Sequence, residues 1–147
     1  MPISKSTNWG RKEKMITYTE SLRGVSHYSL DGFCEGWQQP LTPLQLRSIL
    51  KHSTYRILAM DTEHTRIVGI ITALSDKIHW AFIPYLEVIP AYQKQGIGKR
   101  LMELMIEKTK GIVCIDLTCD TEMQAFYEQF GMVASHGMIL RRYMDEK

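Results

Sequence analysis

The chain has 147 residues, of which 44% are hydrophobic and 23% are charged, a balance that predicts one compact globular domain with a sizeable core. Its formal net charge of +2 is too small to indicate nucleic acid or an anionic membrane as a partner. There is no signal-peptide-like hydrophobic region or bilayer-spanning apolar run, and the three cysteines form no CxxC pair. We therefore expect a cytoplasmic protein with reduced cysteines.

The N-terminal third of the chain has few regular patterns. Residues 1–14 are polar and lack periodic apolar positions, so we expect a flexible tail there, followed by a single domain over residues 15–147. Residues 15–19 alternate weakly and fit an edge strand. Residues 26–37 carry several aromatic side chains without a clean period, which fits a short or broken helix.

A helix is predicted to begin at Thr42, which fits the N-cap position. Pro43 then falls at N1, where its missing N–H costs nothing, and Gln45 falls at N3 and completes a capping box. Leu46, Ile49 and Leu50 recur at helical spacing, so they are expected to form the buried face.

Three strands are predicted in the middle of the chain. Residues 55–60 and 66–74 are β-branched and apolar around a polar turn, and residues 79–89 form a third extended run interrupted by Pro84. Because proline cannot donate to a β-ladder, Pro84 indicates an edge position or a bulge. A helix follows, with Ile97 and Leu101 among the residues on its apolar face.

The C-terminal third is predicted to complete the sheet. Residues 112–118 are apolar or β-branched and fit a central strand. A second capping box, from Thr121 to Gln124, opens a helix that Gly131 would end. Two short strands, near residues 132–135 and 138–143, then close the chain.

Taken in order, these elements predict an α/β or α+β sandwich. Its sheet would be mixed and mostly antiparallel, with about six to seven strands, and about four helices would flank it.

Two glycines mark a candidate anion site between the strand ending near residue 89 and the next helix. The first N–H groups of a helix have no intrahelical acceptor, and the helix dipole adds partial positive charge there. Such a site suits phosphate, and Gly96 and Gly98 would let the backbone approach phosphate oxygens without a Cβ. The rim carries three cations: Lys94, Lys99 and Arg100.

The side chains of this loop argue against two nucleotide sites. A Walker A pattern needs Gly at position 93 and Ser or Thr at position 100, where the chain has Gln93 and Arg100. A dinucleotide fingerprint needs Gly at position 101, where the chain has Leu101. A turn whose glycines serve packing alone remains the alternative.

The loop Gln93-Lys94-Gln95-Gly96-Ile97-Gly98 resembles the Q/R-x-x-G-x-G/A loop of the GNAT superfamily of N-acetyltransferases. The preceding residues 86–90 resemble the strand that leads into that loop, and residues 125–132 resemble a later helix motif of the superfamily. Spacing and order agree from about residue 15 to the end. The resemblance implies one N-acetyltransferase domain over residues 15–147, with a sheet splayed at the cofactor strand.

The resemblance also implies acetyl-CoA as the acetyl donor and no metal. Val88 would offer backbone groups to the cofactor, and the pyrophosphate would be lined by Gln93, Lys94, Gln95, Gly96, Ile97, Gly98 and Lys99. Asp120 stands where many relatives place Asn, so we expect a role near the helix cap rather than a contact with CoA.

Acetyl transfer to an amine needs a donor to the developing oxyanion, a proton for the leaving thiolate and a base for the amine. The N–H of Val88 is the candidate oxyanion donor. Tyr127 is the family-matched acid, because a phenol with a pKa of about 10 is protonated at neutral pH. Deprotonating a lysine-like amine at pH 7 costs roughly 4.6 kcal/mol, which is more than protonation of the leaving thiolate requires. A base for the amine therefore matters more than an acid for the thiolate, and Glu87 is the first candidate for this base and His79 the second.

Structural roles remain open for the same residues. Glu87 fits an exposed strand position, and Tyr127 fits a packing position beside Phe126 and Phe130. A non-catalytic acyl-CoA-binding or regulatory module that kept the loop is therefore the alternative function.

The acceptor is expected to be a small-molecule amine or a peptide amine. Four aromatic residues could wall its pocket or belong to the core: Tyr28, Phe33, Trp37 and Trp80. Neither nucleic acid nor a membrane is expected as a partner. Exposed edge strands near the termini leave a homodimer open.

Overall fold

The protein is described here by a computed structural model that covers residues 15–144. Five strands form one sheet in chain order: β1 (Ile16–Thr19), β2 (Tyr55–Asp61), β3 (Arg66–Ser75), β4 (Trp80–Val88) and β5 (Cys114–Asp116). The first four pair antiparallel and β5 runs parallel to β4, so the sheet is mixed. The predicted tail over residues 1–14 lies outside the described residues.

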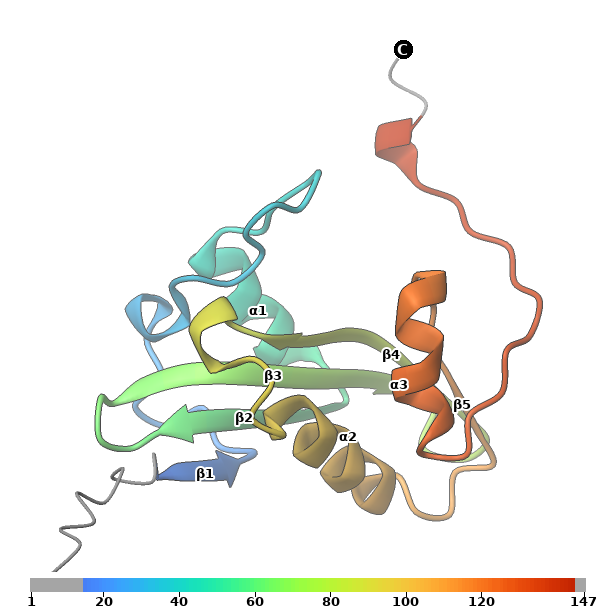
Figure 1. The fold of residues 1–147 in the computed structure, drawn as a ribbon, viewed down its shortest axis with the longest axis horizontal. Coiled ribbons are helices and arrows are strands. Elements are labelled where there is room, and N and C mark those ends of the chain that lie inside the picture. The colour runs from blue at the N-terminus through green and yellow to red at the C-terminus, as the bar shows by residue number, and fades with distance from the viewer. Residues whose placement is uncertain (1–14, 145–147) are drawn as a thin grey trace, which may run out of the picture.

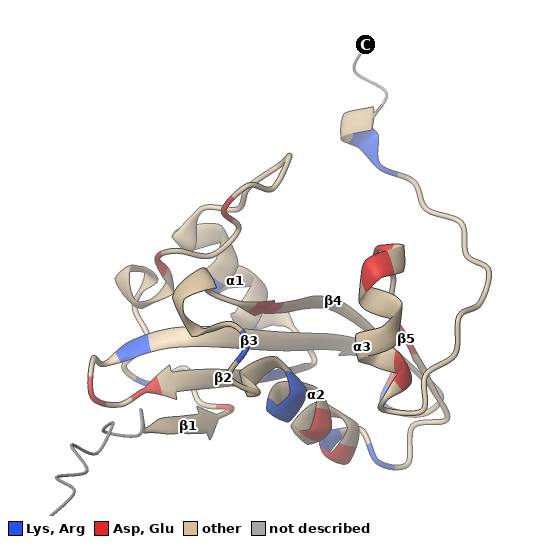
Figure 2. Ribbon diagram, in the orientation of Figure 1, with Lys and Arg blue, Asp and Glu red and all other residues tan. Residues whose placement is uncertain are grey.

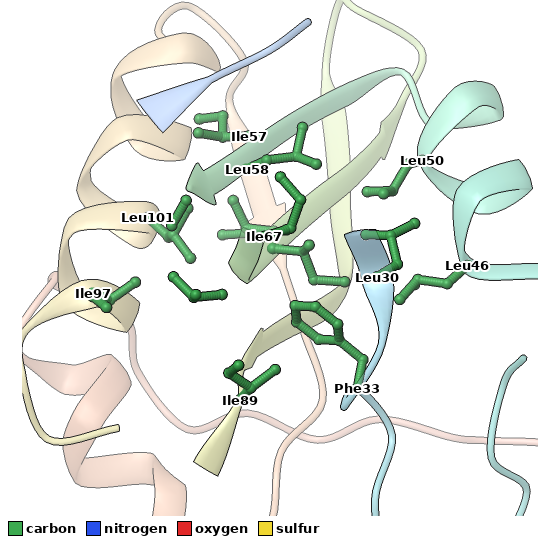
Figure 3. Packing of buried hydrophobic residues seen from close by; sticks show 14 of the residues in the cluster. Leu30, Phe33, Leu46, Leu50, Ile57, Leu58, Ile67, Ile89, Ile97 and Leu101 are labelled. Carbon is green, nitrogen blue, oxygen red and sulfur yellow. The ribbon is translucent and has the colours of Figure 1, made fainter. Parts of the chain in front are cut away.

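Helices cover both faces of the sheet (Figure 1). Helix α1 (Pro43–His52) lies on one face and α2 (Ile97–Lys108) on the other. The hydrophobic core therefore fills two layers, with Leu46 of α1 and Leu101 of α2 on opposite sides of the central strands (Figure 3). Full burial of each such side chain contributes about 1.5–3 kcal/mol, so these two layers are the main source of stability.

The start of α1 is confirmed in detail. The Gln45 N–H donates to Thr42 Oγ1 over 3.2 Å, and the Thr42 N–H donates to Gln45 Oε1 over 2.9 Å. Leu46 and Leu50 are buried, so the capping box and the apolar face that the sequence predicts are both present.

The bulge predicted at Pro84 is also confirmed. Thr72 of β3 lies opposite Tyr85, but Leu74 lies opposite Phe82, so β4 carries one extra residue between them. β5 pairs only with residues 80–82 of β4. Beyond the bulge, the outer edge of β4 has no strand beside it among residues 15–144. The splay that the GNAT resemblance implied at this strand stays a prediction.

The prediction of a long central strand over residues 112–118 is wrong. β5 spans only Cys114–Asp116 and lies at the end of the sheet, with Val113 beside it 71% exposed. The apolar pattern is real, but the parallel ladder ends at Phe82 and Asp116, where β5 stops.

The second capping box is wrong as well. The chain enters α3 (Gln124–Glu128) through a 3-10 turn over Thr121–Met123, and no side chain caps that turn. Gly131 has a φ of +84°, which fits the predicted left-handed stop after this helix.

The counts of strands and helices are lower than predicted. Residues 15–144 contain three α-helices, because residues 26–37 form only a 3-10 turn, His27–Leu30. Gly32, Cys34 and Gly36 all have positive φ, a backbone region that no right-handed helix uses. The strands expected near 132–135 and 138–143 are also absent from the described residues, since this segment has no neighbouring strand to pair with.

Candidate acetyl-donor site

The turn between β4 and α2 leaves a row of backbone N–H groups without acceptors. Gly96 is the N-cap of α2 with a φ of +82°, and its carbonyl accepts the first intrahelical bond, from Arg100 over 3.0 Å. Within the described part of the chain, the N–H groups of residues 94–99 donate to no backbone or side-chain acceptor. Lys94 and Lys99 are exposed beside them, and Figure 2 shows positive residues on the first turn of α2. The turn therefore has the geometry and charge of an anion site.

The open edge of β4 leads directly into this turn. The Ile89 N–H donates to Val68 O of β3 over 2.9 Å. Because neighbouring residues of an antiparallel strand point their amides to opposite sides, the N–H and C=O of Val88 face the unpaired edge. Gln93 Nε2 donates to Val88 O over 2.9 Å and connects the turn to this edge.

Helix α3 packs against the same place. A methyl group on Gly98 would lie 3.7 Å from Val88 Cγ2 and 3.8 Å from Phe126 Cζ, so Gly98 sits where β4 and α3 meet. Tyr127 follows Phe126 and is half-buried, with its ring edge-on to Phe126 at 5.0 Å between centroids. Burial raises the pKa of Tyr127, and the nearby Cys119 raises it further, so the phenol keeps its proton at neutral pH.

The Glu87 side chain points to the face of β4 opposite the Val88 side chain, where two hydrogen bonds from Cys34 hold it. Its Oε1 accepts the Cys34 N–H over 2.7 Å, and Cys34 Sγ lies 3.8 Å from Oε2. Burial raises the pKa of Glu87 above its ordinary value, and the two Cys34 donors oppose that shift. Beside it, the Trp37 ring lies parallel to Tyr85 at 6.1 Å between centroids. Glu87 is thus an oriented carboxylate next to an aromatic wall.

The structure separates the remaining candidates. His79 precedes β4 and its Nε2 lies 3.7 Å from Cys114 Sγ, so it sits roughly 25 Å along the strand from Glu87 and does not belong to the same site. Phe33 is buried in the core, whereas Tyr28 is exposed. Trp80 is partly exposed and donates through Nε1 to Asp116 Oδ2 over 2.6 Å.

Sequence reasoning missed a buried network that anchors the glycine loop. Tyr92, directly before the loop, donates its hydroxyl to Asp61 Oδ2 over 2.5 Å. Asp61 also accepts His64 Nδ1 over 2.8 Å and the N–H groups of Glu63 and His64. The Tyr92 hydroxyl is the largest cause that lowers the Asp61 pKa, to about 2, with the His64 and Glu63 donors adding to it and burial opposing it. An Asp opening a polar turn between two strands was the available signal.

Other features of the described surface do not compete with this site. Within residues 15–144, no group of three or more His, Cys, Asp and Glu side chains is placed to hold a metal ion. No helix in that part of the chain is long and apolar enough to cross a bilayer. A hollow of about 510 Å³, lined in part by Tyr18, Ile57 and Leu104, opens beside the C-terminal half of α2, away from the glycine loop.

Comparison with known proteins decides the family. Residues 22–132 match the family model described as Acetyltransferase (GNAT) family. The chain belongs to the GNAT acetyltransferase family. A crystal structure from Deinococcus radiodurans R1, described as a candidate acetyltransferase, is 36% identical, with a TM-score of 0.84 over 89% of this chain and 91% of that chain.

Two curated relatives agree with this GNAT assignment. The chain is 33% identical over 125 residues to histone acetyltransferase TAP1 of Glycine max, covering 75% of this chain and 53% of the relative. It is 28% identical over 123 residues to the uncharacterized N-acetyltransferase ycf52 of Porphyra purpurea, covering 79% of this chain and 70% of the relative. The GNAT chain described here thus spans about half the length of the soybean protein.

Proposed function

We propose that this GNAT protein transfers the acetyl group of acetyl-CoA to a primary amine, by direct attack of the amine on the thioester in a ternary complex. The observation that carries the proposal is the continuous surface formed by the open β4 edge and the unbonded amides of residues 94–99. An extended chain of amides can pair with a free strand edge, and a diphosphate suits the helix N-terminus. Acetyl-CoA carries both groups, in that order.

The cofactor-binding residues follow from this surface. The diphosphate would lie against the backbone and side chains of Gln93, Lys94, Gln95, Gly96, Ile97, Gly98 and Lys99. The outward N–H and C=O of Val88 would pair with the pantetheine arm at the point where β5 has ended. Gly98 leaves room for this approach, since even a methyl group there would only touch Val88 and Phe126 at ordinary contact distance.

Three groups of the chain would perform the chemistry. The Val88 N–H donates to the thioester oxygen as negative charge develops on it. Glu87 accepts the proton that the amine loses as its nitrogen forms the amide bond, and a carboxylate with a raised pKa is a stronger base than an ordinary one. Tyr127 donates its proton to the sulfur that leaves as the carbon–sulfur bond breaks.

The acceptor would approach from the face of β4 that carries Glu87. Trp37 and Tyr85 wall this face, and an aromatic wall beside a carboxylate suits a cationic amine. The name of the soybean relative, a histone acetyltransferase, adds lysine peptides to small amines as substrates to test. The free cysteines at positions 34, 114 and 119 support the cytoplasm as the proposed compartment.

Calorimetry and a thiol-release assay test the proposal together. Coenzyme A and acetyl-CoA should bind, and free thiol should appear only when an amine from a panel of small amines and lysine peptides is present. Tyr127→Phe should lower kcat by about 10²-fold or more and leave the Kd for acetyl-CoA unchanged. Tyr28→Phe, a loss of hydroxyl at an 81% exposed ring, is the matched control.

The outcomes separate the competing functions. Binding of coenzyme A without thiol release for any amine would favour the non-catalytic acyl-CoA-binding module. No binding of coenzyme A would remove the donor site altogether. Unchanged turnover in Tyr127→Phe would leave the fold and the binding site intact but take the acid role from Tyr127.

A further inference from the structure

We propose that Cys34 is a positioning residue for the base Glu87. The Cys34 N–H holds one carboxylate oxygen, Oε1, and the thiol orients the other, Oε2, as the atom that takes the proton of the attacking amine. The role rests on the function proposed above, because Cys34 acts on the reaction only through Glu87. It gives the buried thiol a task other than packing.

The two contacts of Cys34 with Glu87 differ in strength. The N–H donates to Oε1 over 2.7 Å, a length typical of charge-assisted bonds, whereas Sγ lies 3.8 Å from Oε2. A thiol is a weak donor, and an ionised carboxylate has about four lone-pair sites. Oε2 is therefore oriented but only weakly bound, so it is the more basic of the two oxygens. When the amine nitrogen bonds to the acetyl carbon, the proton that the nitrogen loses goes to Oε2.

The backbone at Cys34 favours this role over packing alone. Cys34 has a φ of +63°, and it lies between Gly32 and Gly36, which also have positive φ. A residue with a Cβ is strained in this region, whereas glycine is not. Strain of this kind persists where the surrounding structure maintains it, and it is found mostly at functional sites. A cysteine at a position where glycine would relieve the strain therefore points to a use for the thiol.

The chain is fixed to the sheet on both sides of Cys34. Before it, Arg66 Nη2 of β3 donates to Asp31 O over 3.2 Å. After it, the Trp37 N–H donates to Cys34 O over 3.3 Å, and the Trp37 ring lies parallel to that of Tyr85 on β4. Cys34 itself is 1% exposed, so these contacts keep its thiol on the face of β4 that carries the base.

The thiol keeps its proton and can act as the donor. Burial raises the pKa of Cys34, a backbone donor opposes this shift, and the charge of Glu87 raises the pKa further. In turn, burial raises the pKa of Glu87, the two Cys34 donors lower it, and the charge of Glu35 raises it. On the sheet, Ile70 lies opposite Glu87, and Tyr85 is its neighbour on the same face. Replacing the thiol thus changes the Glu87 pKa without changing the charge of the site.

Two substitutions of the thiol should shift the Glu87 pKa in opposite directions. Cys34→Ser places a stronger donor beside Oε2, so the Glu87 pKa should fall, whereas Cys34→Ala removes the donor, so the pKa should rise. Carbon-13 NMR of the Glu87 carboxyl group in the protein without substrates should record each shift, of about half a pH unit or more. A packing role would lower Tm in both variants without moving the Glu87 pKa in opposite directions.

The kcat/KM profile should follow these titrations when thiol release is measured with the same amine for every chain. Its acidic limb should move to lower pH in Cys34→Ser and to higher pH in Cys34→Ala, with an unchanged Kd for acetyl-CoA. Cys114→Ser and Cys114→Ala are the matched controls, because that thiol faces His79 before the start of β4, and they should leave the titration and the profile unchanged. Cys34→Gly keeps the N–H at a φ that glycine adopts freely, so it replaces Cys34→Ala if that chain does not fold.

The outcomes separate the role of Cys34 from acetyl transfer itself. Glu87 pKa values that do not move, or that move in the same direction in both variants, would overturn the role, while turnover by the native chain would still support acetyl transfer. A kcat/KM profile that stays in place while the pKa values shift would also overturn it, because Cys34 would then hold Glu87 for a reason other than proton transfer. A native chain that binds coenzyme A but releases no thiol with any amine would refute acetyl transfer, and the role of Cys34 with it.

Discussion

The contact between Tyr92 and Asp61 gives a sharp test of how the glycine loop is anchored. Tyr92→Phe removes one hydroxyl and leaves the ring, which is 7% exposed, in place beside an Asp61 that is fully buried. A hydrogen bond to a buried charged group contributes about 1.5–3 kcal/mol. Because Asp61 keeps its His64 and backbone donors, we expect a loss of about 2 kcal/mol in the free energy of unfolding.

Urea and thermal unfolding measure this loss directly. At about 2.1 cal/mol/K per residue, a chain of this length loses about 6 °C in Tm for 2 kcal/mol. Tyr28→Phe removes the same atom from an exposed ring and should change the free energy of unfolding by less than about 0.5 kcal/mol. The comparison isolates the buried hydroxyl from the chemistry of the substitution.

The pH dependence of the loss has a defined sign. The Asp61 pKa is lowered to about 2 in the folded protein, with the Tyr92 hydroxyl as its largest cause. The stability that this ionised carboxylate contributes is therefore full above its unfolded pKa, near 4, and is lost as the pH falls toward 2. The difference between native protein and Tyr92→Phe should stay constant from pH 7 to about pH 4 and shrink between about pH 4 and about pH 2. A difference below about 0.5 kcal/mol at pH 7, or one that grows on acidification, would refute the reasoning.

Two further predictions concern the acetyl-donor site. Glu87→Gln should lower kcat by about 10²-fold or more without changing the Kd for acetyl-CoA. Burial raises the pKa of Glu87, so the acidic limb of the kcat/KM profile should lie at a higher pH than an ordinary glutamate would give, and it should disappear in this variant. A profile that keeps the acidic limb would exclude Glu87 as the base. Gly96→Ala places a Cβ in open space, but at a φ of +82° that a residue with a Cβ rarely adopts. This variant should lower the free energy of unfolding by about 1–2 kcal/mol and weaken coenzyme A binding in calorimetry. An unchanged free energy of unfolding and an unchanged Kd for coenzyme A would show that the loop does not need this conformation.

The parts of the fold that the sequence alone predicted depend on residues that lie close together in the chain. The capping box of Thr42 and Gln45 is a contact across three positions, and the bulge at Pro84 follows from one missing N–H. The turn from β4 into α2 likewise needs only the local order of strand, glycines and apolar helix face. Each is determined by short-range geometry, and a single sequence records that geometry directly.

The tertiary structure decided what depends on distant partners. Glu87 is oriented by Cys34, 53 positions away, and the glycine loop is anchored through Tyr92 to Asp61, 31 positions away. The apolar run near β5 forms only a three-residue strand, because it pairs with β4 at residues 80–82 alone. The predicted C-terminal strands are absent from the described residues because a strand needs a neighbour to form its ladder. Local sequence patterns indicate which residues can form a helix or a strand. Only the tertiary structure determines whether another element lies where it can pair or pack with that helix or strand.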